Sequence, residues 1–447
     1  MIIDEKILES GITSKLAADL IEQHEAELPR LIKLRDYYLG RHDILNRLRA
    51  SEGTANNRVV CNHAKYIVDM AQSYLTGNKI SYAVSEGYDI EAVKNAYEEQ
   101  DIACMDSELS KTVNIYGRAY ELIYADEDSR PRSAVLQPEN AFVVYAQSVA
   151  ERPLLGVYYY RTFDMQGRCT GVVCNVYDSS YLYRFEAGQD SYRSLMLSGT
   201  ERHYFKAVPL IEYRNNAERQ GDFEQLIPLI DAYNLLCSDR VNDKEQFVDA
   251  FLFLSGIEID SSQAKKLKVE RILMDYDGRG DAKYLSKVMS ESDIKVLRDD
   301  LKDDIHRFSM VPDLSDESFG NNLSGVAIKY KLLGFEQAVK NKERLFAKGL
   351  KRRFELYNRY LAMLSQMSEV PVHRVEIMFT YNLPANELEI AQMISLLTGT
   401  VSSETLIDRL PFVSDAKEEA ELAAEEKTES YRRRLESTQG LAEGGGY

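Results

Sequence analysis

The sequence predicts an α+β protein, because blocks of helical spacing and blocks of strand-like composition follow one another along its 447 residues. Apolar residues recur at helical spacing in residues 12–116 and 223–253. Between these blocks, residues 117–213 are rich in β-branched and aromatic residues and in turn signals, which indicates a β-meander with hairpins. The third observation is an apolar stripe over residues 326–364 that predicts one very long helix.

The composition is that of an ordinary soluble globular protein, with 44% hydrophobic and 28% charged residues. The length allows two or three hydrophobic cores. No apolar run is long enough to cross a bilayer, and the N-terminus lacks a basic region followed by an apolar one, so neither a membrane span nor a signal peptide is predicted. The five cysteines are scattered and form no CxxC pair, which predicts reduced thiols in a cytosolic protein.

The chain carries 55 basic and 72 acidic residues, a net charge of −17. Tight binding along nucleic acid requires clustered Lys and Arg that neutralise phosphates. A chain this acidic is therefore not expected to coat DNA. It remains compatible with a local basic patch, or with a surface past which DNA slides.

The N-terminal block is expected to be helical over residues 12–50, with helix ends near Pro29 and Gly40. Its buried side is predicted to contain Leu16, Leu20, Leu28, Leu31, Leu34 and Tyr38. A further helix ends at Gly77 and is predicted to bury Ile67, Met70, Ala71 and Tyr74. Two more helices are expected over residues 90–100 and 107–116.

The meander is expected to consist of short strands separated by turn residues. These strands are predicted at Tyr120–Tyr124, Phe142–Tyr145, Leu155–Arg161, Gly171–Tyr177, Tyr181–Phe185 and Leu210–Tyr213.

Helical spacing returns over residues 223–253, and Pro228 is tolerated in the first turn of that helix. The apolar register of this helix is Leu226, Ile230, Tyr233, Cys237, Val241, Lys244, Val248 and Phe251. A small β-rich insert follows over residues 255–288, where Asp277-Gly-Arg-Gly-Asp281 signals a tight turn between residues 269–276 and 282–285.

Ser290 and Asp293 then match a capping box that opens another helix. The apolar face of this helix is predicted to contain Ile294, Leu297, Leu301, Ile305 and Phe308. Its aspartates are expected mostly off that face, at Asp299, Asp300, Asp303 and Asp304.

A polar, turn-rich loop over residues 310–325 precedes the long helix. At ~1.5 Å rise per residue this helix would reach roughly 55 Å. Only Gly334 and Gly349 interrupt it, and each is a candidate for a kink or a close backbone approach. The apolar stripe is Ile328, Leu332, Phe335, Val339, Phe346, Leu350, Phe354, Tyr357, Leu361 and Leu364. The cations expected away from it are Lys340, Arg344, Lys348, Lys351, Arg352 and Arg359.

After the long helix, residues 372–381 alternate as a strand. Helices are expected over residues 386–397 and 403–410, and a charged helix over about 414–435.

The sequence shows no recognisable catalytic motif. Gly320 and Gly325 have the spacing of a P-loop, but Val326 and Ala327 stand where Lys and Ser or Thr are required. The six histidines are dispersed, and no HExxH motif or nucleophile elbow occurs. The cluster Asp299–Asp304 could hold Mg²⁺ in principle, but a solvated or channel-facing helix side is the favoured interpretation. No catalytic residue, metal or cofactor is therefore predicted.

Four stretches occur in a specific order and spacing. They are Tyr37-Tyr-Leu-Gly-Arg-His-Asp-Ile44, the segment from Asn57 to Tyr82, the segment from Ile227 to Gly256, and Gly325-Val-Ala-Ile-Lys-Tyr330. Together they resemble the portal (head–tail connector) proteins of tailed bacteriophages, of the type found in long-tailed phages of Gram-positive hosts. The resemblance covers most of residues 20–400.

The resemblance implies a portal fold with a helical and β-rich wing, a two-helix stem, a small α/β clip, a long kinked helix and a helical crown. The kink is expected near Gly334. The implied parts are a wing at 1–224, a stem helix at 225–254, the clip at 255–289, a second stem helix at 290–309, a tunnel loop at 310–325, the long helix and wing strand at 326–384, and the crown and tail at 385–447.

The resemblance also implies where DNA and partners are contacted. Residues of the tunnel loop and of the following helix expected to face DNA are Asp313, Ser315, Asp316, Ser318, Asn321, Asn322, Ser324, Lys329 and Lys331. Stem residues expected to face the channel are Lys295, Asp299, Lys302 and Asp303. Clip residues expected to contact the terminase or the adaptor are Lys265, Lys266, Lys268, Arg271 and Arg279.

As a portal, the chain would form a homo-oligomeric ring, usually of twelve subunits, at one capsid vertex of the virion after assembly in the host cytoplasm. Its expected partners are the terminase large subunit, a head-completion adaptor, the major capsid or scaffolding protein, and double-stranded DNA that passes non-specifically. No membrane partner is expected. Two alternatives stay open: a metal-dependent DNA-processing enzyme that uses Asp299–Asp304, and a monomeric scaffold or adaptor protein.

Overall fold

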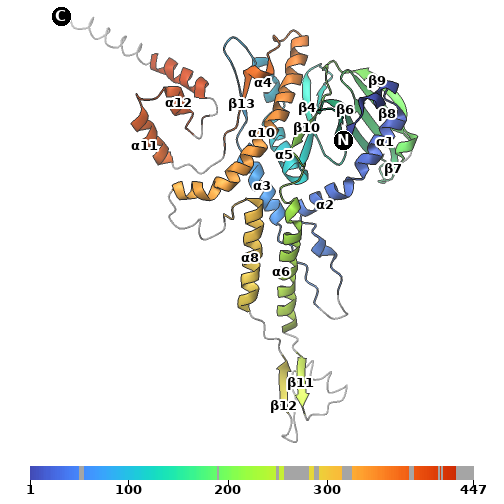
Figure 1. The fold of residues 1–447 in the computed structure, drawn as a ribbon, viewed down its shortest axis with the longest axis vertical. Coiled ribbons are helices and arrows are strands. Elements are labelled where there is room, and N and C mark those ends of the chain that lie inside the picture. The colour runs from blue at the N-terminus through green and yellow to red at the C-terminus, as the bar shows by residue number, and fades with distance from the viewer. Residues whose placement is uncertain are drawn as a thin grey trace, which may run out of the picture. The chain divides into compact units, whose positions relative to one another are not determined.

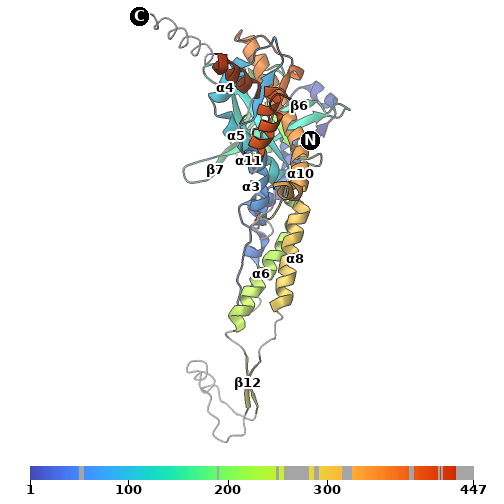
Figure 2. The ribbon, with the colours of Figure 1, turned by 90° about the vertical axis from the view of Figure 1, so that its left-hand side faces the viewer.

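The chain forms two compact units in its structure, a computed structural model (Figures 1 and 2). Unit 1 consists of Met1–Leu39, Ala64–Gln225 and Ser309–Tyr447, and unit 2 consists of Gly40–His63 and Leu226–Phe308. The structure describes residues 1–49, 55–188, 191–247, 251–255, 281–285, 291–314, 325–381, 387–410, 413 and 416–428.

Unit 1 begins with two helices, α1 (Ser14–Glu25) and α2 (Leu28–Tyr38). The Thr13 hydroxyl accepts a hydrogen bond from the backbone N–H of Leu16 and caps α1. Pro29 lies in the first turn of α2, where no intrahelical N–H is needed. The predicted buried side is confirmed at Leu20, Leu31, Leu34 and Tyr38, whereas Leu16 and Leu28 are half-buried.

Three further helices complete the N-terminal part of unit 1: α3 (His63–Thr76), α4 (Glu91–Glu98) and α5 (Ile102–Tyr116). Helix α3 ends one residue before Gly77, as predicted. Helix α5 begins five residues earlier than the sequence suggested, because Asp101 adopts a left-handed conformation, with φ of 51°, and turns the chain directly from the end of α4 into α5. Gly117 ends α5 with φ of 80°, and a Cβ at that position would overlap the backbone of Arg219.

The largest sheet of unit 1 has six strands in the order β1-β5-β6-β7-β8-β9. From β5 to β9 each strand pairs antiparallel with the next, so the predicted meander is confirmed for this part of the chain. The strands are β1 (Ile2–Ile3), β5 (Ala141–Ala146), β6 (Pro153–Phe163), β7 (Cys169–Tyr177), β8 (Tyr181–Ala187) and β9 (Met196–Arg202).

One face of this sheet packs against α1. The shared core contains Leu20 and Ile21 from α1, and Phe142, Val157 and Phe185 from the sheet. Burial of such apolar side chains is the main favourable term in folding, at about 25 cal/mol per Å². The core therefore fixes α1 on the sheet.

A second sheet of three strands has the order β10-β3-β4. The prediction of one continuous meander was wrong here, because β3 and β10 pair with each other and not with the six-stranded sheet. Neither β4 nor β9 is predicted from the sequence; β9 is exposed along its length and lacks apolar alternation. The strands are β3 (Arg118–Ala125), β4 (Pro131–Leu136) and β10 (Leu210–Arg214).

The long helix α10 runs from Gly325 to Met363, 39 residues, and confirms the prediction. Eight positions of the expected apolar stripe are buried: Leu332, Phe335, Val339, Phe346, Leu350, Phe354, Tyr357 and Leu361. Leu364 is half-buried. Four expected cations lie exposed away from the stripe, at Lys340, Arg344, Lys348 and Lys351, and Arg352 and Arg359 are half-buried.

The chain returns from α10 to the N-terminal part of unit 1 through a short strand. β13 (Val375–Met378) pairs antiparallel with β2 (Ser81–Val84). The strand predicted over 372–381 is therefore shorter, since residues 372–374 form a 3-10 turn. Helices α11 (Glu387–Leu397) and α12 (Ser403–Ile407) follow, and residues 416–428 are helical. The other 3-10 turns are Glu5–Ser10, Asp43–Asn46, Tyr192–Ser194 and Glu224–Leu226.

Unit 2 contains two long helices, α6 (Ile227–Phe247) and α8 (Glu291–Ser309). Strand β11 (Phe251–Ser255) pairs antiparallel with β12 (Asp281–Leu285). The prediction that the helix continues to residue 253 was wrong. A short apolar run such as 251–254 fits a helix or a strand by pattern alone, and its pairing with a distant strand decides for the strand.

Two further differences concern the predicted parts. Residues 40–63 group with the helices of unit 2, whereas the sequence placed them in the wing. The expected strand 269–276 lies outside the described residues.

The two glycines of α10 differ in what surrounds them, and this gives a matched pair of variants. A Cβ at Gly349 would overlap the ring of Tyr213, whereas nothing lies within 4 Å of a Cβ at Gly334. We expect Gly349→Ala to destabilise unit 1 by about 1–3 kcal/mol through overpacking. We expect Gly334→Ala to be neutral or stabilising by up to about 1 kcal/mol. Urea unfolding followed by circular dichroism measures both, and equal effects of the two variants would contradict this difference.

Candidate functional site

Unit 1 holds the base of the loop that precedes α10 by one side chain of α3. The hydroxyl of Tyr66 donates to the backbone carbonyl of Pro312 at 2.9 Å and accepts from the backbone N–H of Leu314 at 3.2 Å. Val311 is buried beside them. Because one hydroxyl satisfies two backbone groups of the loop, the point at which the loop leaves unit 1 is fixed. We call these two hydrogen bonds the Tyr66 clamp.

The predicted loop residues fall largely outside the described part of the chain. Asp313 is half-buried next to the Tyr66 clamp, and Lys331 is exposed on α10. Lys329 lies within α10, but its side chain is not among those described. The loop positions outside the described residues are Ser315, Asp316, Ser318, Asn321, Asn322 and Ser324.

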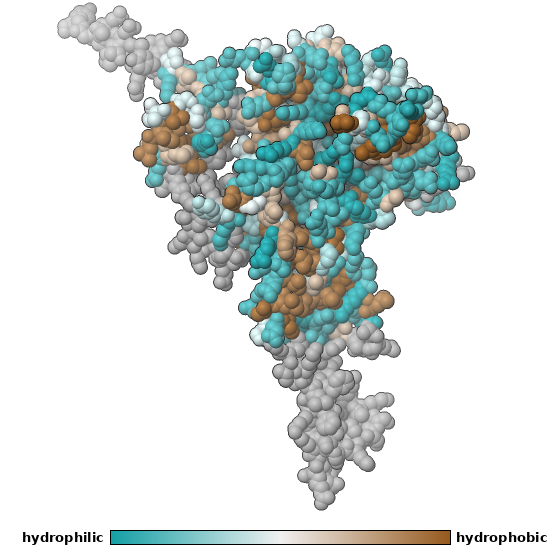
Figure 3. Space-filling model, viewed as in Figure 1, coloured by the Kyte–Doolittle hydropathy of each residue, from teal (hydrophilic) through white to brown (hydrophobic). Residues whose placement is uncertain are grey.

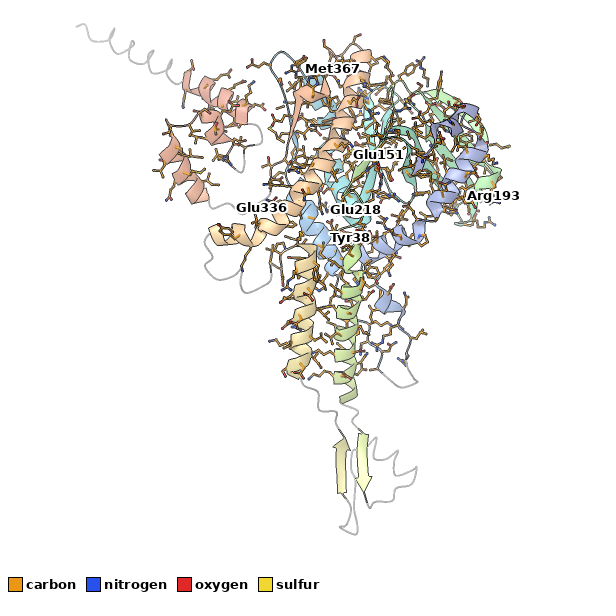
Figure 4. The ribbon with its side chains drawn as sticks, in the orientation of Figure 1. Tyr38, Glu151, Arg193, Glu218, Glu336 and Met367 are labelled. Carbon is orange, nitrogen blue, oxygen red and sulfur yellow. The ribbon has the colours of Figure 1, made fainter. Side chains whose placement is uncertain are left out.

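The first part of α10 is attached to α3 by aromatic contacts. The ring of Phe335 meets the ring of Tyr74 edge-on, with ring centres 4.9 Å apart, and the ring of Tyr381 stacks on Tyr74 with ring centres 5.0 Å apart. Burial, followed by the charge of Glu336, raises the pKa of Tyr74. Figure 4 labels Glu336 on the first part of α10. Tyr381 also donates a hydrogen bond to Glu343 of α10. These contacts fix the helix close to the loop.

The second attachment of α10 is a buried charged cluster around Arg353, which is fully buried. Its Nη1 donates to Asp106 of α5 at 2.6 Å, and its Nε donates to both carboxylate oxygens of Glu121 of β3, at 2.7 and 2.9 Å. The hydroxyl of Tyr213 donates to Glu121 at 2.6 Å. One guanidinium therefore serves two carboxylates, and the cluster holds a helix, a second helix and a sheet together.

The electrostatics of the cluster follow from its burial. Burial raises the pKa of Asp106 to about 6, although Arg353 opposes this and Glu121 adds to it. Burial alone would lower the pKa of Arg353, but Asp106 and Glu121 raise it well above its usual value. The guanidinium thus remains charged. This role cannot be predicted from the sequence, because Arg353 follows Arg352 in a run of cations.

The exposed face of α10 is positively charged. Lys340, Arg344, Lys348 and Lys351 recur at steps of three or four residues, which places them along one side of a helix. Further along, Arg352 and Arg359 both pair with Glu355, at 2.6 and 2.5 Å. The predicted one-sided distribution of charge is therefore confirmed for the exposed half of the helix.

In unit 2, the predicted channel residues lie on α8. Lys295 and Asp303 are exposed, and Asp299 and Lys302 are half-buried. Asp299 pairs with Arg298 at 3.0 Å, and Asp304 pairs with Arg307 at 3.5 Å. Across the described ranges, no three His, Cys, Asp or Glu side chains lie close enough together to hold a metal ion.

The apolar face predicted for α8 is only partly covered within the single chain. Ile305 is fully buried, but Leu297 and Phe308 are 50% and 63% exposed. Helix α6 also exposes apolar side chains, Leu235 at 45% and Val241 at 43%. Figure 3 shows brown, apolar atoms on the surface over these two helices. Large uncovered apolar surfaces on a soluble protein mark interaction sites.

The buried face of α6 changes from apolar to polar along its length. Leu226, Ile230 and Tyr233 are buried as predicted, but Cys237 is half-buried and Val241 is exposed. The buried positions are instead the polar residues Asn234, Ser238 and Asn242, each four residues from the next.

These three side chains bind the backbone of the segment 57–61. Asn234 accepts from the N–H of Cys61 at 2.8 Å, Ser238 from that of Val59 at 2.9 Å, and Asn242 from that of Asn57 at 2.6 Å. Four residues of helix rise about 6 Å and two residues of extended chain rise about 6.6 Å, so the spacings match. We call this arrangement the polar ladder. Spacing of small polar residues by four was its only signal in the sequence.

The clip residues named above all lie outside the described part of the chain: Lys265, Lys266, Lys268, Arg271 and Arg279. No helix among the residues that the structure describes is long and apolar enough to cross a membrane.

The comparisons with known proteins agree with this architecture. Residues 17–432 match the family model described as phage portal protein, SPP1 Gp6-like, so the chain belongs to this family. The chain is 24% identical over 434 residues to the portal protein of Bacillus phage SPP1, covering 91% of this chain and 85% of that protein. It is 23% identical over 442 residues to the portal protein of Clostridium phage phiCD119, covering 91% of this chain and 95% of that protein.

The resemblance predicted from the sequence is therefore confirmed, together with the α+β class and the portal function. Portal proteins are structural components of the phage virion, and this is the role of the chain.

The buried cluster gives a prediction about pH. The pKa of Asp106 is about 6 in the folded protein and about 3.9 in an unfolded chain, so the folded state alone holds this proton between those values. Stability contributed by Asp106 therefore falls as the pH rises from about 4 to about 6. Relative to Asp106→Asn, the native protein should lose up to about 3 kcal/mol over this range.

Urea unfolding of both proteins at pH 4, 5, 6 and 7 measures this difference. Groups that are the same in both proteins, such as His24 and Glu212, cancel in the comparison. A difference in unfolding free energy that stays constant over this range would contradict the titration of Asp106.

Proposed function

We propose that copies of this chain form a ring of twelve subunits at one vertex of the phage capsid, around a central channel for double-stranded DNA. The main support is the family, together with the uncovered apolar surfaces of α6 and α8. A ring of identical subunits needs two different, complementary faces on each subunit. Leu235 on α6 and Leu297 on α8 would be covered by neighbouring subunits in such a ring.

The parts of the chain are proposed to act as follows. Unit 1 supplies the wing, α6 and α8 form the stem around the channel, and β11 and β12 with the residues between them form the clip. The loop that starts at the Tyr66 clamp is the tunnel loop, and α10 connects it to the wing. Residues 385–447 form the crown on the side of the capsid interior.

DNA passes through this ring without being held tightly. Alternating Lys and Asp residues on α8, at Lys295, Asp299, Lys302 and Asp303, present weak and regularly spaced contacts in place of a strongly basic wall. The acidic balance of the chain, −17 in net charge, supports the same conclusion. The proposed partners are the terminase large subunit and a head-completion adaptor at the clip, and the major capsid or scaffolding protein at the wing.

The chain is proposed to act without catalysis of its own, as a conduit and a docking site, with the packaging ATPase on a separate protein. Assembly takes place in the host cytoplasm.

Light scattering after size-exclusion chromatography tests the ring, with negative-stain images of the same peak. We expect particles with a central hole and a mass near twelve times that of the 51.1 kDa chain. Because apolar surfaces on α6 and α8 drive closure, Leu297→Glu together with Leu235→Glu should leave the chain monomeric. Exposed Ala232→Ser on α6 serves as the control. A native chain that stays monomeric at every concentration, with scaffolding and capsid proteins present, would contradict the ring and favour a monomeric adaptor.

A second prediction concerns the tunnel loop. Changing Asn321 and Asn322 together to Ala should reduce DNA packaging at least several-fold while rings still assemble, because their amides would no longer grip DNA transiently. Packaging is measured as nuclease-protected DNA in a defined assembly reaction. Asn341→Ala, on the exposed face of α10, is the matched control. Normal packaging by the double variant would show that DNA packaging does not depend on these two side chains.

A further inference from the structure

Unit 2 contains two cysteines on neighbouring stretches of backbone. Cys61 belongs to the extended segment 57–61, which lies along α6, and Cys237 belongs to α6 itself. The N–H of Cys61 binds Asn234, three residues before Cys237 on the same helix, and the Cys237 thiol contributes to the raised pKa of the Cys61 thiol. Both residues are half-buried, so a small molecule can reach them. We propose that Cys61 and Cys237 are an oxidisable pair that forms a disulfide after the protein leaves the reducing host cell.

The backbone around Cys61 is held in place for this reaction. Its N–H is bonded to Asn234, which lies three residues before Cys237 and therefore on the same side of α6. The next two rungs of the polar ladder fix Val59 and Asn57 along the same helix. A disulfide forms only where the chain already places the two sulfurs near each other, since the bond is about 2.05 Å long and tolerates little distortion. The polar ladder holds the backbone of Cys61 on the part of α6 that carries Cys237.

The reaction balances with a low-molecular-weight disulfide such as oxidised glutathione as the oxidant. One cysteine thiolate attacks a sulfur of the oxidant, forms a mixed disulfide and releases one glutathione thiolate. The second cysteine thiolate then attacks the protein sulfur of that mixed disulfide and releases the second glutathione. Two protein thiols lose two electrons and two protons, and one oxidised glutathione becomes two reduced molecules.

The surroundings make this reaction slow at neutral pH. Burial raises the pKa of the Cys61 thiol to about 11, and the neighbouring Cys237 thiol adds to the shift. Arg298 opposes it. Because the thiolate is the reacting species, few Cys61 thiols react at pH 7. In this proposal the reducing cytoplasm keeps the pair reduced during assembly, and the pair oxidises during the long extracellular life of a virion.

The disulfide would change how the segment is attached to α6. In the reduced protein, hydrogen bonds of the polar ladder hold the segment 57–61 on the helix. The covalent bond adds a permanent link at the Cys61 end. It closes a long loop of chain, and disulfides that close long loops constrain the unfolded chain strongly. Unit 2 would therefore gain stability on oxidation.

The experiment uses the full-length protein, incubated with oxidised glutathione at pH 8.5 and then trapped with a maleimide. Before trapping, we expect the mass to fall by about 2 Da relative to the reduced chain. Two fewer thiols should react, and a peptide map should link Cys61 to Cys237. The melting temperature should rise by about 3 °C or more and return on reduction.

Two variants separate this pair from the remaining cysteines. Cys61→Ser should abolish both the linked peptide and the shift in melting temperature, and exposed Cys104→Ser in unit 1 should retain both. Stable mixed disulfides with glutathione at both positions would overturn the proposal. The same holds if all thiols survive, or if Cys61 is linked to another copy of the chain. The peptide map of the native chain decides the question even if a variant folds poorly.

Discussion

The structure of unit 1 depends on how the guanidinium of Arg353 is satisfied. A cation in a fully buried position is strongly destabilising unless carboxylates and hydrogen bonds surround it. Asp106 and Glu121 supply those contacts from α5 and β3, and they can do so only if α10 has one particular rotation about its axis. Removing one partner would leave an uncompensated buried charge, whereas an apolar core would tolerate a small rotation of the helix. The cluster therefore specifies where each face of α10 points.

The fixed rotation of α10 about its axis has consequences along the whole helix. Tyr213 fills the space beside Gly349, one turn before Arg353, and Phe335 packs on Tyr74 near the other end. With its rotation fixed at these places, α10 presents Lys340, Arg344, Lys348 and Lys351 to solvent, and its N-terminal end follows the proposed tunnel loop. The other end of that loop is held by Tyr66 of α3. Both attachments of the loop thus belong to unit 1, so the loop that is proposed to contact DNA is anchored at both ends to one unit.

The sequence predicts those elements whose periodicity is long or whose strands pair with sequence neighbours. The stripe of α10 spans many turns, and β5 to β8 follow one another in the sheet, so both are correctly predicted. Features decided by distant partners are not. Residues 251–255 become a strand because β12 pairs with them, and Arg353 is buried because Asp106 and Glu121 come from other parts of the chain. The polar ladder is not predicted for the same reason. From the sequence alone Asn234 is expected on the surface, and only its contact with segment 57–61 shows that it is buried.

Unit 2 exposes apolar side chains that the single chain does not cover. Its internal contacts on α6 are largely polar, from Asn234 to Asn242, while apolar side chains such as Leu235 and Phe308 remain exposed. Buried hydrogen bonds of this kind contribute only about 1 kcal/mol each, and apolar burial contributes most of the stability of a domain. A helix pair that buries polar side chains and exposes apolar ones becomes more stable when another surface covers the exposed apolar side chains. Binding of a neighbour to the folded state alone would raise the stability of unit 2 by an amount that grows with the logarithm of the subunit concentration. In the proposed ring, folding of α6 and α8 would therefore be coupled to closure of the ring. This coupling would account for an apolar pattern on α6 and α8 that exceeds what their own chain can bury.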